Sequence, residues 1–136
     1  MRVRARTTAD LDDLVEVAAR VRAVDLYPLY LPDDDLHRFL TRPVPLSAWV
    51  AEVDHRVVGH VSLNSESNPQ VMKVLRQSGI TGDVGVVARL LVEPAARRRG
   101  LGALLLEQAR SEAEAQGRTP VLDVVASATS AIALYR

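Results

Sequence analysis

Three arginines followed by two closely spaced glycines form the segment of this chain best suited to bind an anion. The run consists of Arg97, Arg98, Arg99, Gly100, Leu101 and Gly102. It opens an amphipathic segment, yet the start of a helix disfavours cations, and glycine costs about 0.5–1 kcal/mol there relative to alanine. A bound polyphosphate compensates for both, because it accepts hydrogen bonds from backbone N–H groups and pairs with arginine. The spacing therefore predicts a polyphosphate site.

Other anion-binding motifs fit these residues less well. The chain has no Gly-Lys-Ser or Gly-Lys-Thr for a Walker loop, and Leu105 stands where a dinucleotide-binding fingerprint has its third glycine. Nucleic-acid binding through the arginines is a further alternative. However, 17 basic residues balance 17 acidic ones, and only 4% of residues are aromatic. We therefore expect a local anion site, with neither nucleic acid nor membrane as a partner.

Hydrophobic periodicity predicts the elements that position this run. Helical spacing is found at residues 8–24, 36–40, 71–76, 100–116 and, after a cap at 127–130, near 131–135. Strand patterns are found at residues 3–6, 47–53, 57–64, 84–92 and 121–125. The strand at 84–92 is almost continuously aliphatic, which indicates burial on both faces. Its connection through a helix to the next strand implies a right-handed parallel unit.

Length and composition favour one domain over residues 1–136. The chain is 48% hydrophobic and 25% charged, which suits a single core. It has no cysteine, which excludes a disulfide framework, a thiolate nucleophile and a sulfur-ligated metal. No apolar stretch approaches the roughly 18–20 residues of a membrane helix, and the start lacks the apolar region of a secretory signal. We expect a soluble cytoplasmic protein.

Residues 90–102 resemble the acyl-CoA-binding motif of the GNAT superfamily of N-acetyltransferases. In that motif Arg or Gln is followed after two residues by Gly, and after one more by Gly or Ala. Arg97, Gly100 and Gly102 fill those positions, and the order of expected elements is also similar to that family's. The resemblance implies an α/β fold with a mixed, mostly antiparallel, twisted sheet flanked by helices. Because family members continue into two further strands, the fold is expected to be incomplete at the C-terminus, and a homodimer is one way to cover that edge.

The resemblance also implies acetyl-CoA as acyl donor, an amine as acceptor, and no metal. Backbone N–H groups at the arginine-glycine turn are expected to hold the pyrophosphate, and the end of the strand at 84–92 to hydrogen-bond the pantetheine arm. The implied CoA-binding residues are Leu91, Val92, Arg97, Arg98, Arg99, Gly100, Leu101, Gly102 and Ala103. Tyr135 matches a tyrosine that in many members protonates the departing thiolate, which implies a catalytic role. The alternative for Tyr135 is packing on the sheet.

Acyl transfer needs a neutral amine and a polarised thioester carbonyl. Without cysteine, a thioester-linked enzyme intermediate is excluded, so we expect direct attack within a ternary complex. The carboxylates considered as a base are Asp83 and Glu52, with water as the alternative. A non-catalytic acyl-CoA-binding or regulatory module is the competing hypothesis, because the strand at 84–92 carries no carboxylate of its own and the terminal strands are missing.

Other polar and aromatic residues have two interpretations each. His60 is either an ordinary strand residue or an acceptor contact. Tyr27 and Tyr30 either anchor a proline-rich loop or border the acceptor. The acidic residues 33–35 are interpreted as a helix cap rather than a metal site, and Trp49 as part of the core.

Overall fold

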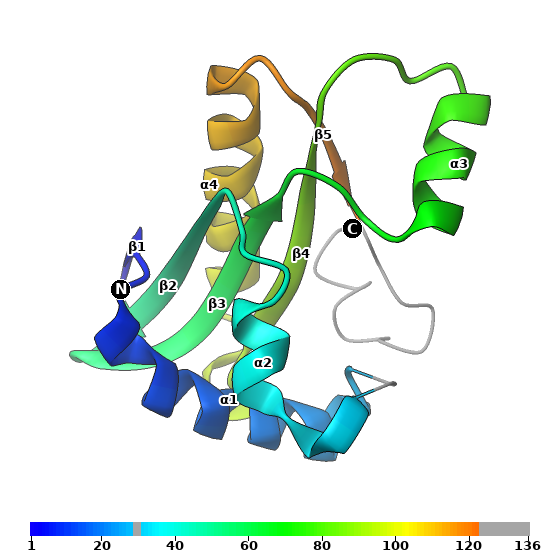
Figure 1. Cartoon of the computed structure of the whole chain (residues 1–136). Coiled ribbons are helices and arrows are strands. Elements are labelled where there is room, and N and C mark those ends of the chain that lie inside the picture. The colour runs from blue at the N-terminus through cyan, green and yellow to red at the C-terminus, as the bar shows by residue number, and fades with distance from the viewer. Residues whose placement is uncertain (29–30, 123–136) are drawn as a thin grey trace.

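The five strands of the computed structural model, which describes residues 1–28 and 31–122, form one sheet in the order β1-β2-β3-β4-β5 (Figure 1). Their bounds are β1 (Arg2–Ala5), β2 (Ser47–Val53), β3 (Arg56–Asn64), β4 (Val84–Val92) and β5 (Thr119–Leu122). Neighbouring strands are antiparallel from β1 to β4, and β5 runs parallel to β4. The predicted mixed, mostly antiparallel sheet is confirmed.

Every helix predicted within the described residues is present. The α-helices in this part of the chain are α1 (Leu11–Asp25), α2 (Leu36–Thr41), α3 (Pro69–Gln77) and α4 (Leu101–Ala115). The caps explain where two of them begin: the Asp35 side chain accepts from the Arg38 N–H, and the Asn68 side chain accepts from the Val71 N–H. The predicted cap role of the acidic residues is thereby confirmed for Asp35. The end of the predicted strand, 123–125, and the helix near 131–135 lie outside the described residues.

Helices cover both faces of the sheet (Figure 1). On one face α4 packs against a cluster that includes Trp49, which is 8% exposed and part of the core as predicted. On the other face α1 and α2 pack against Val50 and Leu91. This double cover explains why β4 is aliphatic at nearly every position. Among the described helices, none is long and apolar enough to cross a membrane.

Gly85 marks a place where α4 lies very close to β4. A Cβ atom on Gly85 would lie 2.8 Å from the Ala113 Cβ atom and 3.0 Å from Leu63 Cδ1. Gly85→Ala is therefore expected to lower the free energy of unfolding by about 1–3 kcal/mol, measured by urea denaturation. Adding Ala113→Gly should recover part of the loss, although a helical glycine itself costs about 1 kcal/mol. An unchanged urea midpoint for Gly85→Ala would contradict this close packing.

Candidate active site

The start of α4 offers several backbone donors to an anion. Gly100 precedes the helix with a φ of +79°, and within the described residues no side chain caps it. A Cβ atom there would meet nothing within 4 Å, so the backbone conformation, rather than packing, requires glycine. The helical hydrogen bonding begins with the Leu104 N–H donating to the Gly100 carbonyl at 3.1 Å. The N–H groups of Leu101, Gly102 and Ala103 therefore have no intrahelical acceptor, and they point with the helix dipole toward any bound anion.

The three arginines of the turn are not equivalent. The Arg97 guanidinium turns inward, where its Nε donates to the Val92 carbonyl at 3.1 Å and its Nη1 to Asp25 at 3.2 Å. The Arg97 side chain is 19% exposed and that of Asp25 is 8% exposed. Arg98 and Arg99 are exposed. Arg97 thus ties the turn to the ends of α1 and β4, and the other two arginines are left at the surface.

Removing the charge of Asp25 tests this tie. Asp25→Asn is expected to lower the free energy of unfolding by about 1–2 kcal/mol, because the Arg97 guanidinium loses its partly buried counter-charge. The matched control is Asp34→Asn, which breaks the Arg22–Asp34 pair, where the Asp34 side chain is 85% exposed. The control should change stability by less than about 0.5 kcal/mol. Equal urea midpoints for the two variants would show that the Asp25–Arg97 pair contributes no more to stability than the exposed Arg22–Asp34 pair.

β4 contains a bulge that the sequence pattern did not reveal. The register pairs Leu91 with His60 but Ala88 with Ser62, so two residues of β4 lie opposite one of β3. Arg89, at the bulge, has a φ of +55°. Because of the extra residue, Val87, Leu90 and Val92 share the face toward α4, whereas strict alternation would group Val87 with Leu91.

Two side chains of β3 hold the bulge. His60 Nδ1 lies 2.8 Å from the Arg89 carbonyl oxygen, and Ser62 Oγ donates to the Ala88 carbonyl at 3.1 Å. His60 Nε2 lies 3.0 Å from Arg6 Nη1. A guanidinium only donates, so Nε2 accepts and Nδ1 carries the proton of a neutral imidazole. His60 is fully buried, and its desolvation, with the charges of Arg6 and Arg89 nearby, lowers its pKa to about 4. These contacts favour the interpretation of His60 as a structural strand residue.

β4 and β5 pair over only part of their length. Their ladder runs from Val84 opposite Thr119 to Val87 opposite Leu122. Beyond Val87, the β5 side of β4 has no partner strand among residues 1–28 and 31–122. The side chains of Leu91 and Val92 are buried in the two cores, so what they offer a ligand is their backbone.

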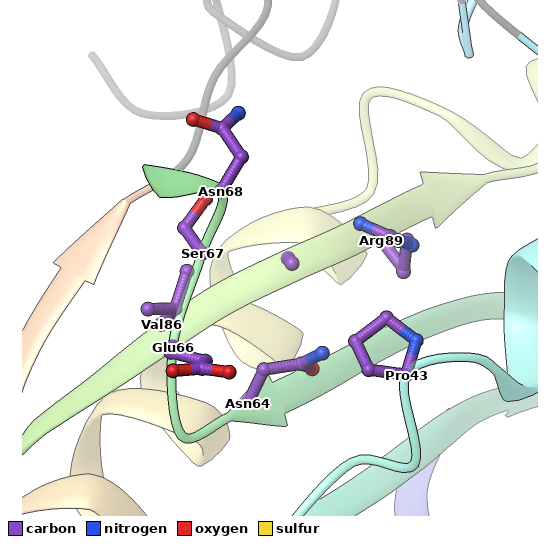
Figure 2. A pocket seen from close by; sticks show the side chains of 8 residues that line it. Pro43, Asn64, Glu66, Ser67, Asn68, Val86 and Arg89 are labelled. Atoms are coloured by element: carbon purple, nitrogen blue, oxygen red, sulfur yellow. The ribbon is translucent and has the colours of Figure 1, made fainter. Parts of the chain in front are cut away.

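A cavity of about 340 Å³ adjoins the bulge (Figure 2). Its walls come from the end of β3, the middle of β4, the loop before α3 and the segment after α2. The residues that line it are Pro43, Asn64, Glu66, Ser67, Asn68, Val86, Ala88 and Arg89. Sequence reasoning had missed this cavity, because its lining comes from three separate segments spread over positions 43–89.

The Arg89 side chain is held from one side. Its guanidinium carbon lies 4.6 Å from the centre of the Phe39 ring, and its Nε donates to the Phe39 carbonyl at 3.1 Å. Tyr27 packs edge-on against the same ring at 5.8 Å. Tyr27 therefore anchors its own loop on Phe39, the α2 residue that supports Arg89, and loop anchoring was one of its two interpretations. Tyr30 lies outside the described residues.

The candidate bases lie away from this cavity. Glu52 is on β2, separated from β4 by β3, and it pairs with Arg4. Asp83 precedes β4 at the end opposite Leu91. Glu66 is the carboxylate that lines the cavity, and no pattern in its polar loop had indicated it. Tyr135 lies outside the described residues, so its role stays a prediction. In the described part of the chain, no three His, Cys, Asp or Glu side chains are grouped as metal ligands.

A comparison with protein families decides what kind of protein carries this site. The model of the acetyltransferase (GNAT) family matches residues 12–136. The chain belongs to the GNAT family. It is therefore an acyltransferase, and the family that the motif at 90–102 had indicated is confirmed. A comparison with curated proteins gives no match.

Solved acetyltransferases have the same fold as this GNAT protein. Ribosomal-protein-alanine N-acetyltransferase from Brucella melitensis biovar Abortus 2308 is 21% identical with a TM-score of 0.70, over 98% of this chain and 86% of that one. A predicted acetyltransferase with acetyl-CoA from Clostridium acetobutylicum is 18% identical with a TM-score of 0.69, over 98% and 87%. Chaetomium thermophilum Naa20 in complex with a bisubstrate analogue is 28% identical with a TM-score of 0.65, over 99% and 68%.

Proposed function

We propose that this GNAT protein, as a single domain over residues 1–136, transfers an acetyl group from acetyl-CoA to an amine in a ternary complex. The observation that carries the proposal is the position of the α4 donors directly after the edge of β4 that lacks a partner strand. One site suits a pyrophosphate and the other suits an extended amide chain, which are consecutive parts of CoA. The Clostridium acetobutylicum relative, whose structure contains acetyl-CoA, supports this choice of donor.

The order of these sites predicts how the donor lies. The pyrophosphate accepts from the N–H groups of Leu101, Gly102 and Ala103, with Arg98 and Arg99 balancing its charge. The pantetheine arm then runs back along β4 from Val92 toward Arg89. That direction brings the thioester to the bulge, beside the 340 Å³ cavity. The acceptor enters from this cavity.

The reaction itself is a direct displacement. The neutral amine nitrogen attacks the thioester carbonyl carbon, a C–N bond forms and the C–S bond breaks. The amine loses a proton, and the CoA thiolate takes one up as it leaves. Preorganised backbone N–H groups on β4 are suited to stabilise the oxyanion that develops on the carbonyl. Tyr135 is proposed as the acid that protonates the thiolate.

The test combines binding with turnover. Acetyl-CoA is titrated into the protein by calorimetry, and CoA release is then followed with a thiol reagent across a panel of amines. Because the chain contains no cysteine, the thiol signal comes from CoA alone. We expect saturable binding and amine-dependent thiol release. Tight binding without release on any amine would contradict the enzyme and favour the non-catalytic acyl-CoA-binding module.

A further inference from the structure

Asn64 is a buried polar side chain whose oxygen has no hydrogen-bonding partner among residues 1–28 and 31–122. It is the last residue of β3, it is 6% exposed, and it lines the 340 Å³ cavity. Within the described residues, its Oδ1 atom accepts no hydrogen bond. Most buried polar atoms in folded proteins are paired, so an unpaired one beside a cavity indicates a donor supplied by a ligand. That donor must enter through the cavity.

Two opposite charges flank this amide. Glu66 contributes a carboxylate from the loop after β3, and Arg89 contributes a guanidinium from β4. Figure 2 shows Glu66 and Asn64 near each other at the end of β3, with Arg89 at a separate point of the rim. The Phe39 carbonyl uses only the Nε donor of Arg89, and no other described residue occupies its two terminal nitrogens. This leaves the planar donor pair that suits a carboxylate.

The chemistry of these three side chains indicates which functional groups a ligand of the cavity carries. A carboxylate and an amide oxygen on one side accept from an ammonium or amine, and a guanidinium on the other side donates to a carboxylate. A cavity of about 340 Å³ holds a molecule the size of an amino acid. Its wall includes Ala88 and Arg89, at the point on β4 where the donor thioester is expected.

We propose that this cavity selects a free amino acid as the acceptor, with its amino group at Glu66 and Asn64 and its carboxylate at Arg89. The proposal rests on the proposed acetyl transfer, and it adds the substrate class. A peptide N-terminus has an amide where a free amino acid has its carboxylate, so Arg89 discriminates against it. A simple amine also lacks the partner for Arg89.

The substrate test compares each acceptor with its own amide. Thiol release from acetyl-CoA is measured with the standard L-amino acids other than cysteine, whose own thiol would react with the reagent, and with the carboxamide of each. At least one amino acid should have a kcat/KM value tenfold or more above that of its carboxamide, because the neutral carboxamide has no negative charge to pair with the Arg89 guanidinium. Arg89→Gln should abolish this preference, mainly by lowering kcat/KM for the amino acid. Equal use of acids and amides, or an equal loss for both in Arg89→Gln, would overturn the proposal.

Two further variants separate binding from folding. Asn64→Leu removes an acceptor that has no partner in the described part of the chain, so the urea midpoint should not fall, whereas KM for the amino acid should rise about tenfold or more. Glu66→Gln changes an exposed residue and should raise KM in the same way without a change in stability. Arg76→Gln, at an exposed arginine of α3 that does not line the cavity, is the matched control for Arg89→Gln. A lower urea midpoint for Asn64→Leu with unchanged KM would show that Asn64 is structural.

A binding measurement keeps the substrate class testable without turnover. Each amino acid and its carboxamide is titrated into the protein saturated with CoA, and binding is followed by nuclear magnetic resonance. We expect the amino acid to bind at least tenfold more tightly than its amide, and Arg89→Gln to remove the difference. If acetyl-CoA binds and no amine reacts, the proposed function fails, and these titrations still decide the ligand. If amines react but acids and amides bind equally, only the substrate class is wrong.

Discussion

Ala103→Glu is expected to weaken acetyl-CoA binding by about 10- to 100-fold without destabilising the protein. Ala103 is exposed and is the third residue of α4, among the N–H groups that we assign to the pyrophosphate. A carboxylate there lies close to the phosphate charges, and two like charges about 5 Å apart repel by roughly 3 kcal/mol at an effective dielectric constant of 20. In the free protein the same carboxylate faces a helix N-terminus, which favours it by about 0.3–1 kcal/mol.

The opposite signs of these two effects make the variant informative. Acetyl-CoA affinity is measured by calorimetry, and the free energy of unfolding by urea denaturation. Ala103→Gln is the matched control, because it has the same size without the charge and should bind acetyl-CoA within about threefold of the parent. Unchanged affinity in Ala103→Glu would place the pyrophosphate elsewhere. Weaker binding together with lower stability would instead indicate damage to α4.

Acidification from pH 6.5 to about 4 is expected to lower the free energy of unfolding by roughly 3 kcal/mol through His60 alone. The pKa of His60 falls from 6.5 to about 4 in the folded protein, because the buried imidazole is desolvated and the positive charges of Arg6 and Arg89 lie nearby. Between these two values the unfolded chain binds a proton that the folded protein does not. The free energy of unfolding therefore rises with pH in this window. The contribution of His60 is fully present above pH 6.5 and is lost as the pH falls toward 4.

Urea midpoints measured at intervals from pH 7.5 to pH 4 check this prediction. His60→Gln should be less stable at neutral pH, and most of the pH dependence between 6.5 and 4 should disappear. The exposed His55 gives the control His55→Gln, which should keep the dependence of the parent. Asp10 interferes little, because its hydrogen bonds with Arg4 lower its pKa from 3.8 to about 2, so most of its contribution is lost below the pH range of the experiment. An equal slope in His60→Gln and the parent would contradict the assignment.

Local sequence patterns predicted the elements of this fold well. The helix over Leu101–Ala115 and the strand over Val84–Val92 were found within one residue of their ends, because their apolar periods are long and unbroken. The predicted start of α3 was less accurate. The pattern began at residue 71, but Asn68 caps the helix and Pro69 occupies its first turn, so it begins two residues earlier.

Sequence patterns identified the arginine-glycine turn, whose role in CoA binding stays a prediction, and they missed the cavity beside β4. The arginine-glycine turn could be recognised, because its donors lie next to one another in the chain and glycine marks the positive φ. The ion pair between Arg97 and Asp25 could not be predicted, since the two residues are 72 positions apart in the chain. The bulge was also missed. Its one local signal was Arg89, a charged residue within an aliphatic run, and its cause is the contact of the Arg89 carbonyl with His60 on the next strand.

The arginine-glycine turn and the family it indicates therefore follow from the sequence, because helix capping, dipole and backbone conformation depend on neighbouring residues. The cavity that we propose for the acceptor depends on contacts across the sheet. Asn64, Glu66 and Arg89 come from a strand end, a loop and a bulge, and only the pairing of β3 with β4 places them around one cavity. Strand register is set by the packing of whole faces, so a one-residue bulge changes which side chains meet, and a local pattern with one charged residue does not determine that change.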